Sequence, residues 1–236
     1  MAIINKKDNS VEAMFNGIAH RYDLLNQILS FGIHGLWRKR LVKRILKHKP
    51  SRVIDIATGT ADVAIAIAKK DENVNIEGVD IADKMIAIGK SKVKNKGFEK
   101  RISLSRAYAE SLPFKDEIFN VATVAYGVRN FNDPKKGLEE MFRVIKSGGS
   151  IHVLEFVNPK LLIIRWIFGF YFQSVLPLLG RLISGHKHAY TYLPKSVKIF
   201  AERQDFVKML SDVGFVEASY TIQSFGIAAI YSAIKP

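Results

Sequence analysis

The chain has 236 residues, with 36 Lys and Arg against 22 Asp and Glu, a formal net charge of +14 and a pI of about 9.8. It contains no cysteine, which excludes a disulfide framework and thiol chemistry. This length suits one large α/β domain with its own core, and the N-terminus has no apolar secretory segment, so we expect a cytoplasmic protein. The basic charge suits a polyanion, either nucleic acid or an anionic membrane surface, unless it is only a soluble, lysine-rich face.

The first segment, residues 8–49, has the apolar spacing of helices. Within it, His20, Tyr22 and Asp23 are close enough to line the mouth of a pocket, although an ordinary solvated helix turn has the same composition. The run 37–49 is a strongly basic amphipathic helix, of a kind that can lie on a lipid surface.

Residues 52–62 predict a strand, a tight turn of small residues and the start of a helix. Gly59 lets the backbone approach a ligand closely, and the helix opening at Thr60 presents unpaired N–H groups. The next strand, 74–80, ends in Asp80, whose carboxylate can accept both hydroxyls of a ribose. Because ligands of open α/β sheets bind beyond the carboxyl ends of the strands, we expect a nucleoside-containing cofactor here.

The acids of this turn favour one nucleoside cofactor over another. A dinucleotide site needs G-x-G-x-x-G to admit a pyrophosphate, whereas this turn has a single glycine and ends in Asp62. Carboxylates such as Asp55 and Asp62 are unfavourable beside a pyrophosphate and favourable beside a sulfonium and an amino group. The turn therefore favours S-adenosylmethionine over NAD, although any buried strand followed by a helix produces a similar string.

The remaining elements alternate between strands and helices. Strands are predicted at 101–106, 118–125, 150–156, 215–222 and 226–233, and helices at 83–96, 133–146 and 202–213. This order predicts an α/β fold with a doubly wound, mostly parallel, seven-stranded sheet that an antiparallel pair completes.

Residues 160–183 interrupt this alternation with the most apolar run in the chain. We interpret it as an inserted helical lid over the carboxyl edge of the sheet, with a buried core helix as the alternative. A membrane span is disfavoured because Arg165, Gln173 and Pro177 lie within the run. The polar and aromatic stretch 185–194 then faces a ligand or water, and its two histidines have no accompanying acid, so no metal site is expected.

The chain is thus expected to be one domain, 1–236. Residues 8–49 form N-terminal helices, 50–156 the cofactor-binding core, 157–200 the lid insertion, and 201–236 the final helix and strands.

Several motifs carry a resemblance to a known family. They are the cofactor turn with Asp80, Leu112-Pro113-Phe114, Ser30-Phe31-Gly32-Ile33-His34, Tyr126-Gly127-Val128-Arg129-Asn130, Arg143 to Gly149, Glu155-Phe156 and Ala189 to Pro194. The chain resembles class I S-adenosylmethionine methyltransferases and, more narrowly, the menaquinone and ubiquinone C-methyltransferases. The resemblance covers nearly the whole chain.

The resemblance implies methyl transfer from S-adenosylmethionine to a ring carbon of a polyprenylated quinol, either demethylmenaquinol or its benzoquinol counterpart. We favour demethylmenaquinol because the short chain has no targeting extension. The implied cofactor-binding residues are Asp55, Gly59, Thr60, Asp80, Tyr108 and Ala109. Three positions depart from the family pattern, where Ala61 replaces a glycine, Tyr108 an Asp or Asn, and Ala125 a serine.

Methyl transfer to a carbon beside a phenolic hydroxyl needs alignment, a base for the hydroxyl proton and a cation for the developing phenolate. We assign the cation to Arg129 and the base to His20, with Tyr22 and Asn130 lining the ring site. An ion pair between Arg129 and a nearby acid is the structural alternative. His152, inside a strand, is expected to be a core histidine.

The expected partners are a polyprenyl quinol and an anionic membrane surface, which would make the protein peripherally membrane-associated, and a homodimer is left open. Three rival functions are a nucleic-acid methyltransferase, a lipid-binding scaffold with a degenerate pocket, and a dehydrogenase. No nucleic-acid recognition module is appended, so we expect no nucleic acid partner.

Overall fold

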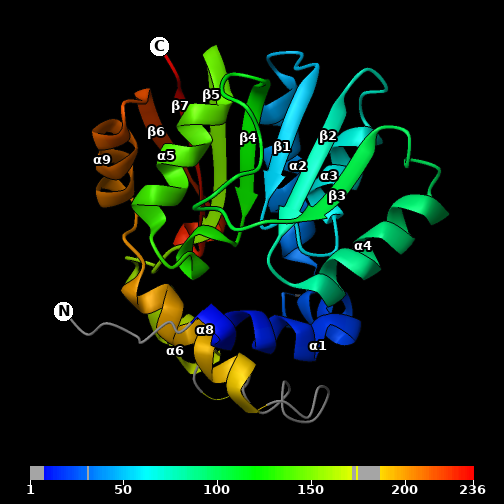
Figure 1. Cartoon of the computed structure of the whole chain (residues 1–236). Coiled ribbons are helices and arrows are strands. Elements are labelled where there is room, and N and C mark those ends of the chain that lie inside the picture. The colour runs from blue at the N-terminus through cyan, green and yellow to red at the C-terminus, as the bar shows by residue number, and fades with distance from the viewer. Residues whose placement is uncertain (1–7, 31, 172–173, 175–186) are drawn as a thin grey trace.

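A computed structural model describes residues 8–30, 32–171, 174 and 187–236. Seven strands form one sheet in the order β3-β2-β1-β4-β5-β7-β6 (Figure 1). The strands are β1 (Arg52–Ile56), β2 (Asn75–Asp80), β3 (Ile102–Arg106), β4 (Phe119–Ala125), β5 (Ile145–Phe156), β6 (Val216–Gln223) and β7 (Ala228–Ile234). The first five pair in parallel, and β7 runs antiparallel to β5 and β6. The predicted fold is confirmed, and its order reverses between β1 and β4, where such folds bind ligands.

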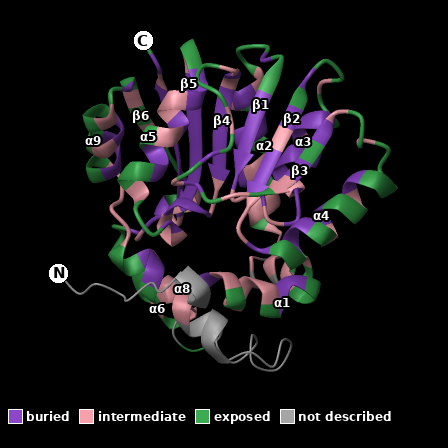
Figure 2. Cartoon of the chain, in the orientation of Figure 1, coloured by how far each residue is buried: buried purple, intermediate pink, exposed green. Residues whose placement is uncertain are grey.

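Helices cover both faces of this sheet. One face packs against α2 (Ile33–Leu46), α3 (Asp62–Ala68) and α4 (Asp83–Asn95), and the other against α5 (Pro134–Val144) and α9 (Gln204–Val213). The strands are largely buried between these layers (Figure 2). The central strands carry almost continuous apolar runs because both of their faces are covered.

A third group of helices lies beyond the carboxyl edge of the sheet, at the bottom of Figure 1. It comprises α1 (Asp8–Leu29), α6 (Leu162–Phe170) and α8 (Lys187–Ile199). Two short 3₁₀ turns, η1 (Val128–Asn130) and η3 (Ser224–Gly226), follow β4 and β6 at the same edge. These elements enclose the region in which a ligand is expected.

Several boundaries differ from the sequence predictions. The first helix is continuous to Leu29, α2 begins at Ile33 rather than at Trp37, and α3 begins two residues later than predicted. The polar and aromatic stretch 185–194, predicted to face a ligand or water, belongs to α8 from Lys187 onward. That helix continues through Pro194, which sequence rules treat as a helix breaker.

The apolar side of the basic helix α2 is buried rather than exposed. Trp37, Leu41, Val42 and Ile45 are buried against the body of the protein. A contact of this helix with a lipid surface therefore cannot involve these four apolar residues, because they belong to the core. Only its exposed cations, such as Lys39 and Lys43, are available to a membrane.

The apolar run of the predicted lid contains α6, and this helix is not a buried core helix. Leu162, Ile163 and Trp166 are each more than 70% exposed, and Phe170 is 58% exposed. Most of the remaining predicted lid, 172–173 and 175–186, lies outside the described residues. Among the helices that the structure describes, none has the length and apolarity to cross a membrane.

Candidate functional site

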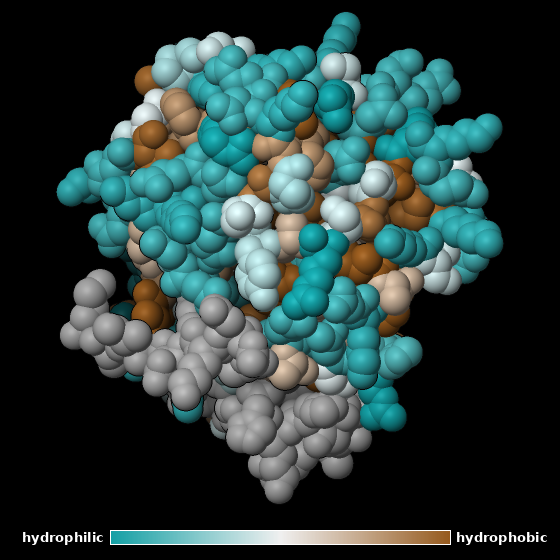
Figure 3. All heavy atoms as spheres, in the orientation of Figure 1, coloured by the Kyte–Doolittle hydropathy of each residue, from teal (hydrophilic) through white to brown (hydrophobic). Residues whose placement is uncertain are grey.

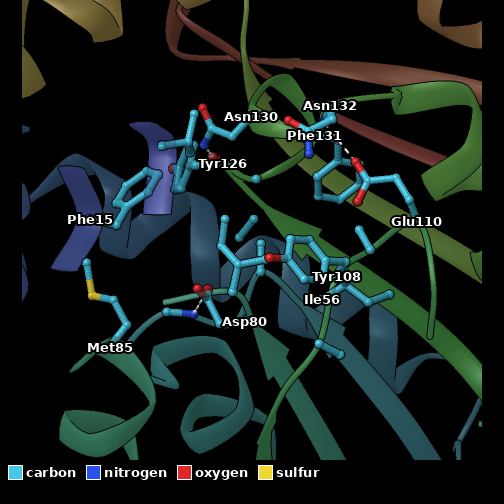
Figure 4. A pocket seen from close by; sticks show the side chains of 18 of the residues that line it. Phe15, Ile56, Asp80, Met85, Tyr108, Glu110, Tyr126, Asn130, Phe131 and Asn132 are labelled. Carbon is cyan, nitrogen blue, oxygen red and sulfur yellow. Dashed lines mark hydrogen bonds between the residues drawn. The ribbon is translucent and has the colours of Figure 1, made fainter. Parts of the chain in front are cut away.

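A cavity opens at the carboxyl edge where the sheet order reverses (Figure 4). Its walls come from the ends of β1, β2 and β4, from the loop after β3, and from α1. The lining includes Phe15, Tyr22, Ala57, Gly59, Asp80, Ile81, Met85, Tyr108, Ala109, Glu110, Tyr126, Gly127, Asn130 and Phe131. Four of the six residues predicted from the sequence to bind the cofactor, namely Gly59, Asp80, Tyr108 and Ala109, lie in this wall.

Asp80 is positioned by the backbone of the cofactor turn. Its Oδ2 accepts the Gly59 N–H at 2.8 Å, and its Oδ1 accepts the Ala82 N–H at 2.9 Å. Burial raises the pKa of Asp80 above its usual value. Each carboxylate oxygen keeps a further lone pair, so the group can still accept hydroxyls of a bound sugar.

The turn itself has a constrained backbone. Ala57, Gly59 and Ala61 all have positive φ values, of 53°, 56° and 65°. This conformation is costly for residues other than glycine. The bends aim the Gly59 N–H at Asp80 and leave the turn exposed to the cavity.

Asp55 and Thr60 do not line the cavity. The carboxylate of Asp55 is buried beneath the turn, where Oδ2 accepts the Thr58 hydroxyl at 2.6 Å, and burial raises its pKa to about 7. The Thr60 hydroxyl donates to Asp23 Oδ1 at 2.6 Å instead of facing a ligand. In this structure both residues support the turn from behind.

Asp62 also faces away from the cavity, into an ionic cluster. Lys92 Nζ lies 2.6 Å from Asp23 Oδ2 and 2.6 Å from Asp62 Oδ1, and Arg38 pairs with Asp62. The cations and the hydrogen bonds that they make lower the pKa of Asp62 despite its burial. The proposed contact of Asp62 with a sulfonium is not supported, because two cations of α2 and α4 already hold this carboxylate.

Tyr108 and Ala109 form the wall opposite α1. Ala109 is buried, whereas the Tyr108 side chain is 38% exposed at the rim. Figure 4 shows Tyr108 and Glu110 across the cavity from Phe15 and Tyr126. The position of Tyr108 is compatible with a flat face for an aromatic base.

Arg129 faces an acid. Its Nη1 lies 2.5 Å from Glu155 Oε1 and also donates to the Tyr126 carbonyl at 2.6 Å. The side chains of Arg129 and Glu155 are 8% and 0% exposed. Burial raises the pKa of Glu155, and the Arg129 charge opposes that shift. The structural alternative for Arg129, an ion pair, is therefore what the structure contains.

The other predicted catalytic residues separate into two groups. Tyr22 lines the cavity, and burial raises the pKa of its hydroxyl. Asn130 also lines it, and its Oδ1 accepts the Tyr192 hydroxyl at 3.1 Å. His20 is exposed and does not line the cavity, so the structure offers no support for its role as the base.

Sequence reasoning assigned no role to Glu155, Tyr126 or Tyr192. Glu155 is a completely buried acid at the end of an apolar strand, which is a detectable signal because buried acids need partners. Tyr126 has a positive φ of 60°, and no sequence pattern indicates this. Tyr192 comes from α8, in the predicted lid insertion, and the sequence analysis assigned only the general stretch 185–194 to a ligand or to water.

The position of His152 agrees with the sequence analysis. His152 is buried in β5 and contacts the Ser232 hydroxyl through Nδ1 at 2.9 Å, as expected of a core histidine. Within the described residues, no group of three or more His, Cys, Asp or Glu side chains is arranged to hold a metal ion. The cavity can therefore be interpreted as a nucleoside pocket that leads from Asp80 toward the buried pair at Arg129.

Comparisons with known proteins agree with this geometry. A model of the ubiE/COQ5 methyltransferase family matches residues 3–235. The chain is 42% identical to the ubiquinone/menaquinone biosynthesis C-methyltransferase UbiE of Geobacter sulfurreducens, over 98% of this chain and 91% of that protein. It is 39% identical to the demethylmenaquinone methyltransferase of Bacteroides fragilis, over 98% and 94%.

Solved structures support the fold. The chain is similar to a SAM-dependent methyltransferase of Thermotoga maritima, with a TM-score of 0.66, 19% identity and coverage of 95% of this chain and 99% of that one. A phosphoethanolamine N-methyltransferase of Haemonchus contortus, solved in complex with S-adenosyl-L-methionine, has a TM-score of 0.62 at 12% identity, over 83% and 52% of the two chains.

Proposed function

This chain belongs to the ubiE/COQ5 methyltransferase family, and we propose that it methylates a ring carbon of demethylmenaquinol. It is an S-adenosylmethionine-dependent C-methyltransferase of quinone biosynthesis. The observation that carries the proposal is the cavity at the carboxyl edge, in which Asp80 and Gly59 offer a ribose acceptor beside an open turn.

The strand order gives the bound cofactor a direction. Asp80 ends β2, and Tyr108 follows β3, so the ribose and adenine belong on this side of the cavity. Gly59 and Gly127 follow β1 and β4, where a Cβ on Gly127 would meet Ala57 at 2.5 Å. This narrow part suits the methionine portion, and it directs the sulfonium methyl toward the end of β4.

The quinol ring then belongs between β4 and α1. Tyr22, Tyr126 and Asn130 line the cavity on this side, next to the buried pair of Arg129 and Glu155. In-line transfer requires mainly that the ring carbon be aligned with the methyl group. We propose that Arg129 contributes a positive potential that the Glu155 carboxylate partly cancels. Its role is then to hold this side of the cavity in position, rather than to bind the phenolate as an isolated cation.

Two arguments favour demethylmenaquinol over the benzoquinol of ubiquinone biosynthesis. The Bacteroides fragilis relative, at 39% identity, bears the demethylmenaquinone name alone. The wall beside the proposed ring site is also aromatic, since Phe15 and Tyr22 meet edge to face at 6.2 Å. A flat bicyclic ring covers more of such a wall than a single ring does.

The function is tested by methyl transfer from labelled S-adenosylmethionine to a short-tailed demethylmenaquinol and to its benzoquinol analogue. We expect turnover on the first and a lower kcat/KM on the second. Transfer to neither, with cofactor binding intact, would contradict the substrate class. The variant Asp80→Asn should weaken cofactor binding at least tenfold by calorimetry, because an amide cannot accept both N–H groups, whereas the exposed Asp83→Asn should not.

We further propose that the carboxyl edge is the membrane-facing side. Almost all of the large exposed apolar side chains belong to elements at this edge, namely Leu24, Ile33, Leu36, Leu161, Leu162, Ile163, Trp166, Phe170, Ile199 and Phe225. The face seen in Figure 3 is by contrast mostly hydrophilic over the sheet and its flanking helices. Exposed apolar patches of this kind mark membrane or protein contacts, and the proposed substrate has a lipid tail.

Cations accompany this apolar surface. Lys160, Arg165, Lys195 and Lys198 are exposed on α6, on α8 or next to α6. Each such cation contributes roughly 1 kcal/mol near an anionic bilayer. Replacing Trp166 and Phe170 with serine should reduce binding to phospholipid vesicles in a flotation assay while leaving cofactor binding unchanged. Unchanged flotation would remove α6 from the membrane contact.

A further inference from the structure

Tyr126 has a buried hydroxyl that no other described residue satisfies. Its oxygen is inaccessible to solvent and has no hydrogen-bond partner in the part of the chain that the structure describes. A buried polar group without a partner costs free energy, and such groups usually mark the place of a bound molecule or an ordered water. The residue also lines the candidate cavity (Figure 4), so the missing partner can be a ligand.

The backbone holds Tyr126 in an unusual conformation. It is the first residue after β4 and has a φ of 60°, which is strained for a tyrosine. Its N–H donates to the Leu154 carbonyl at 2.7 Å, and its own carbonyl accepts from Arg129 Nη1. The ring packs on Phe156, with centroids 4.9 Å apart. Strain that the surroundings maintain in this way is typical of functional positions.

The electrostatic surroundings keep this hydroxyl protonated. Burial, with the nearby Glu155 charge, raises the pKa of Tyr126 well above its usual value, while Arg38 and Arg129 oppose the shift. A neutral tyrosine is therefore available as a hydrogen-bond donor rather than as a base. A donor stabilises the phenolate oxygen that forms when the quinol hydroxyl loses its proton, which is the state from which the ring carbon attacks the methyl group.

We propose that the Tyr126 hydroxyl donates a hydrogen bond to a ring oxygen of the substrate. The inference rests on the proposed function, because it places a phenolic substrate at the end of β4. Tyr22, on α1, faces the same cavity, but its hydroxyl interacts with Asn26. The Tyr192 hydroxyl already donates to Asn130. Of these three tyrosines, Tyr126 is the one whose hydroxyl has no partner among the described residues.

The test pairs Tyr126→Phe with substrates that lack one ring oxygen. Three acceptors are compared, a short-tailed naphthalenediol and its two monodeoxy analogues. With the diol, Tyr126→Phe should lower kcat/KM about 3- to 10-fold, the range of one neutral hydrogen bond. The analogue that lacks the hydroxyl beside the reacting carbon cannot be methylated, so all three compounds are also compared by their dissociation constants from the complex of the enzyme with S-adenosylhomocysteine. The loss of affinity caused by Tyr126→Phe should persist with one monodeoxy analogue and vanish with the other, which identifies the oxygen that accepts the bond.

The control variant is Tyr220→Phe, on the edge strand β6, which should leave the rate with the diol and all three dissociation constants unchanged. The same loss on all three acceptors, or no loss on any, would overturn the proposal and leave the hydroxyl to an ordered water. Calorimetry with S-adenosylmethionine and a thermal unfolding curve show whether Tyr126→Phe is folded and binds the cofactor. If the wild type binds the cofactor but methylates none of the acceptors, the proposed function fails instead.

Discussion

At the residue scale, the ion pair of Arg129 and Glu155 decides how the site is interpreted. Sequence reasoning treats Arg129 as a cation for the substrate, whereas the structure places it 2.5 Å from a buried carboxylate. A buried pair of this kind can be neutral overall for stability, yet removing one partner is costly because it leaves the other charge uncompensated.

We therefore expect Arg129→Met to lower the free energy of unfolding by about 3–5 kcal/mol, measured by urea denaturation. The double variant Arg129→Met, Glu155→Leu should recover most of this loss, since both charges are gone. The rate of methyl transfer by the double variant then shows whether Arg129 has only a structural role or also acts on the substrate. If it is folded and as active as the wild type, Arg129 is structural only, and if it is folded and inactive, the residue acts on the substrate.

His152 gives a pH dependence of stability. Burial lowers its pKa from 6.5 to about 3, with His48 and Arg44 adding to the shift. The unfolded chain therefore binds a proton between pH 6.5 and 3 that the folded protein does not bind, so this residue's contribution to stability is present above pH 6.5 and is lost as the pH falls.

Between pH 7.5 and 5.5, His152 should reduce the free energy of unfolding by about 1.4 kcal/mol. Asp55 acts in the opposite direction, because its raised pKa of about 7 means that its folded form binds the proton more tightly. The measurement is therefore the difference in the free energy of unfolding between the wild type and His152→Gln at each pH. A difference that does not change from pH 7.5 to 5.5 would contradict a buried, neutral histidine.

At the element scale, α1 covers the cavity and is held there by an ionic cluster. Phe15 and Tyr22 line the pocket from this helix, and Asp23 ties it to Lys92 of α4 and Thr60 of the cofactor turn. The same lysine holds Asp62. One cation therefore joins the covering helix to the turn beneath it.

The variant Lys92→Met should loosen α1 without unfolding the sheet. The pair with Asp23 is partly exposed, with side chains 23% and 41% accessible, so the effect on global stability should be no more than about 1 kcal/mol. Hydrogen exchange should increase in residues 8–29, and S-adenosylmethionine should dissociate faster in stopped-flow measurements. The exposed Lys90, on the same helix, provides the control as Lys90→Met. Equal hydrogen exchange of residues 8–29 in the Lys92→Met and Lys90→Met variants would contradict the prediction that Lys92 holds α1 in place.

At the scale of the whole molecule, the net charge of +14 and the exposed apolar side chains of the carboxyl edge both favour binding to the proposed partner, an anionic membrane surface. The N-terminus of α2 lies at this edge, where the Trp37 indole donates to Ser224 of η3, so the C-terminal cations of α2 lie away from it. The cations that can approach the bilayer are then those around α6, rather than the whole basic helix.

Charge reversal distinguishes these two sets of cations. Lys160→Glu with Arg165→Glu should weaken binding to anionic vesicles strongly, whereas Lys43→Glu with Lys47→Glu should have a smaller effect. Binding of the wild type should fall as salt shortens the Debye length from about 10 Å at 0.1 M to about 3 Å at 1 M. Equal binding to neutral and anionic vesicles, or a larger effect of the α2 pair, would contradict this orientation.

The sequence by itself determined the succession of elements and the edge of the sheet at which the cavity lies. Apolar runs with a period of two or 3.6 identify strands and helices, and the rule that ligands meet the carboxyl ends of parallel strands selects Gly59 and Asp80. Such signals are local, because each depends on neighbouring residues of one segment. The resemblance to the methyltransferases is equally a property of linear motifs.

Only the tertiary structure decided where the charged side chains point. Asp62 and Thr60 follow the same turn as Gly59, yet they face Lys92 and Asp23, which are 30 and 37 residues away in the chain. Arg129 meets Glu155 because β4 and β5 are neighbours, and His20 lies on the outer side of a helix whose Tyr22 faces inward. A side chain's partner is set by the packing of distant segments, and a single sequence does not contain that packing in local form.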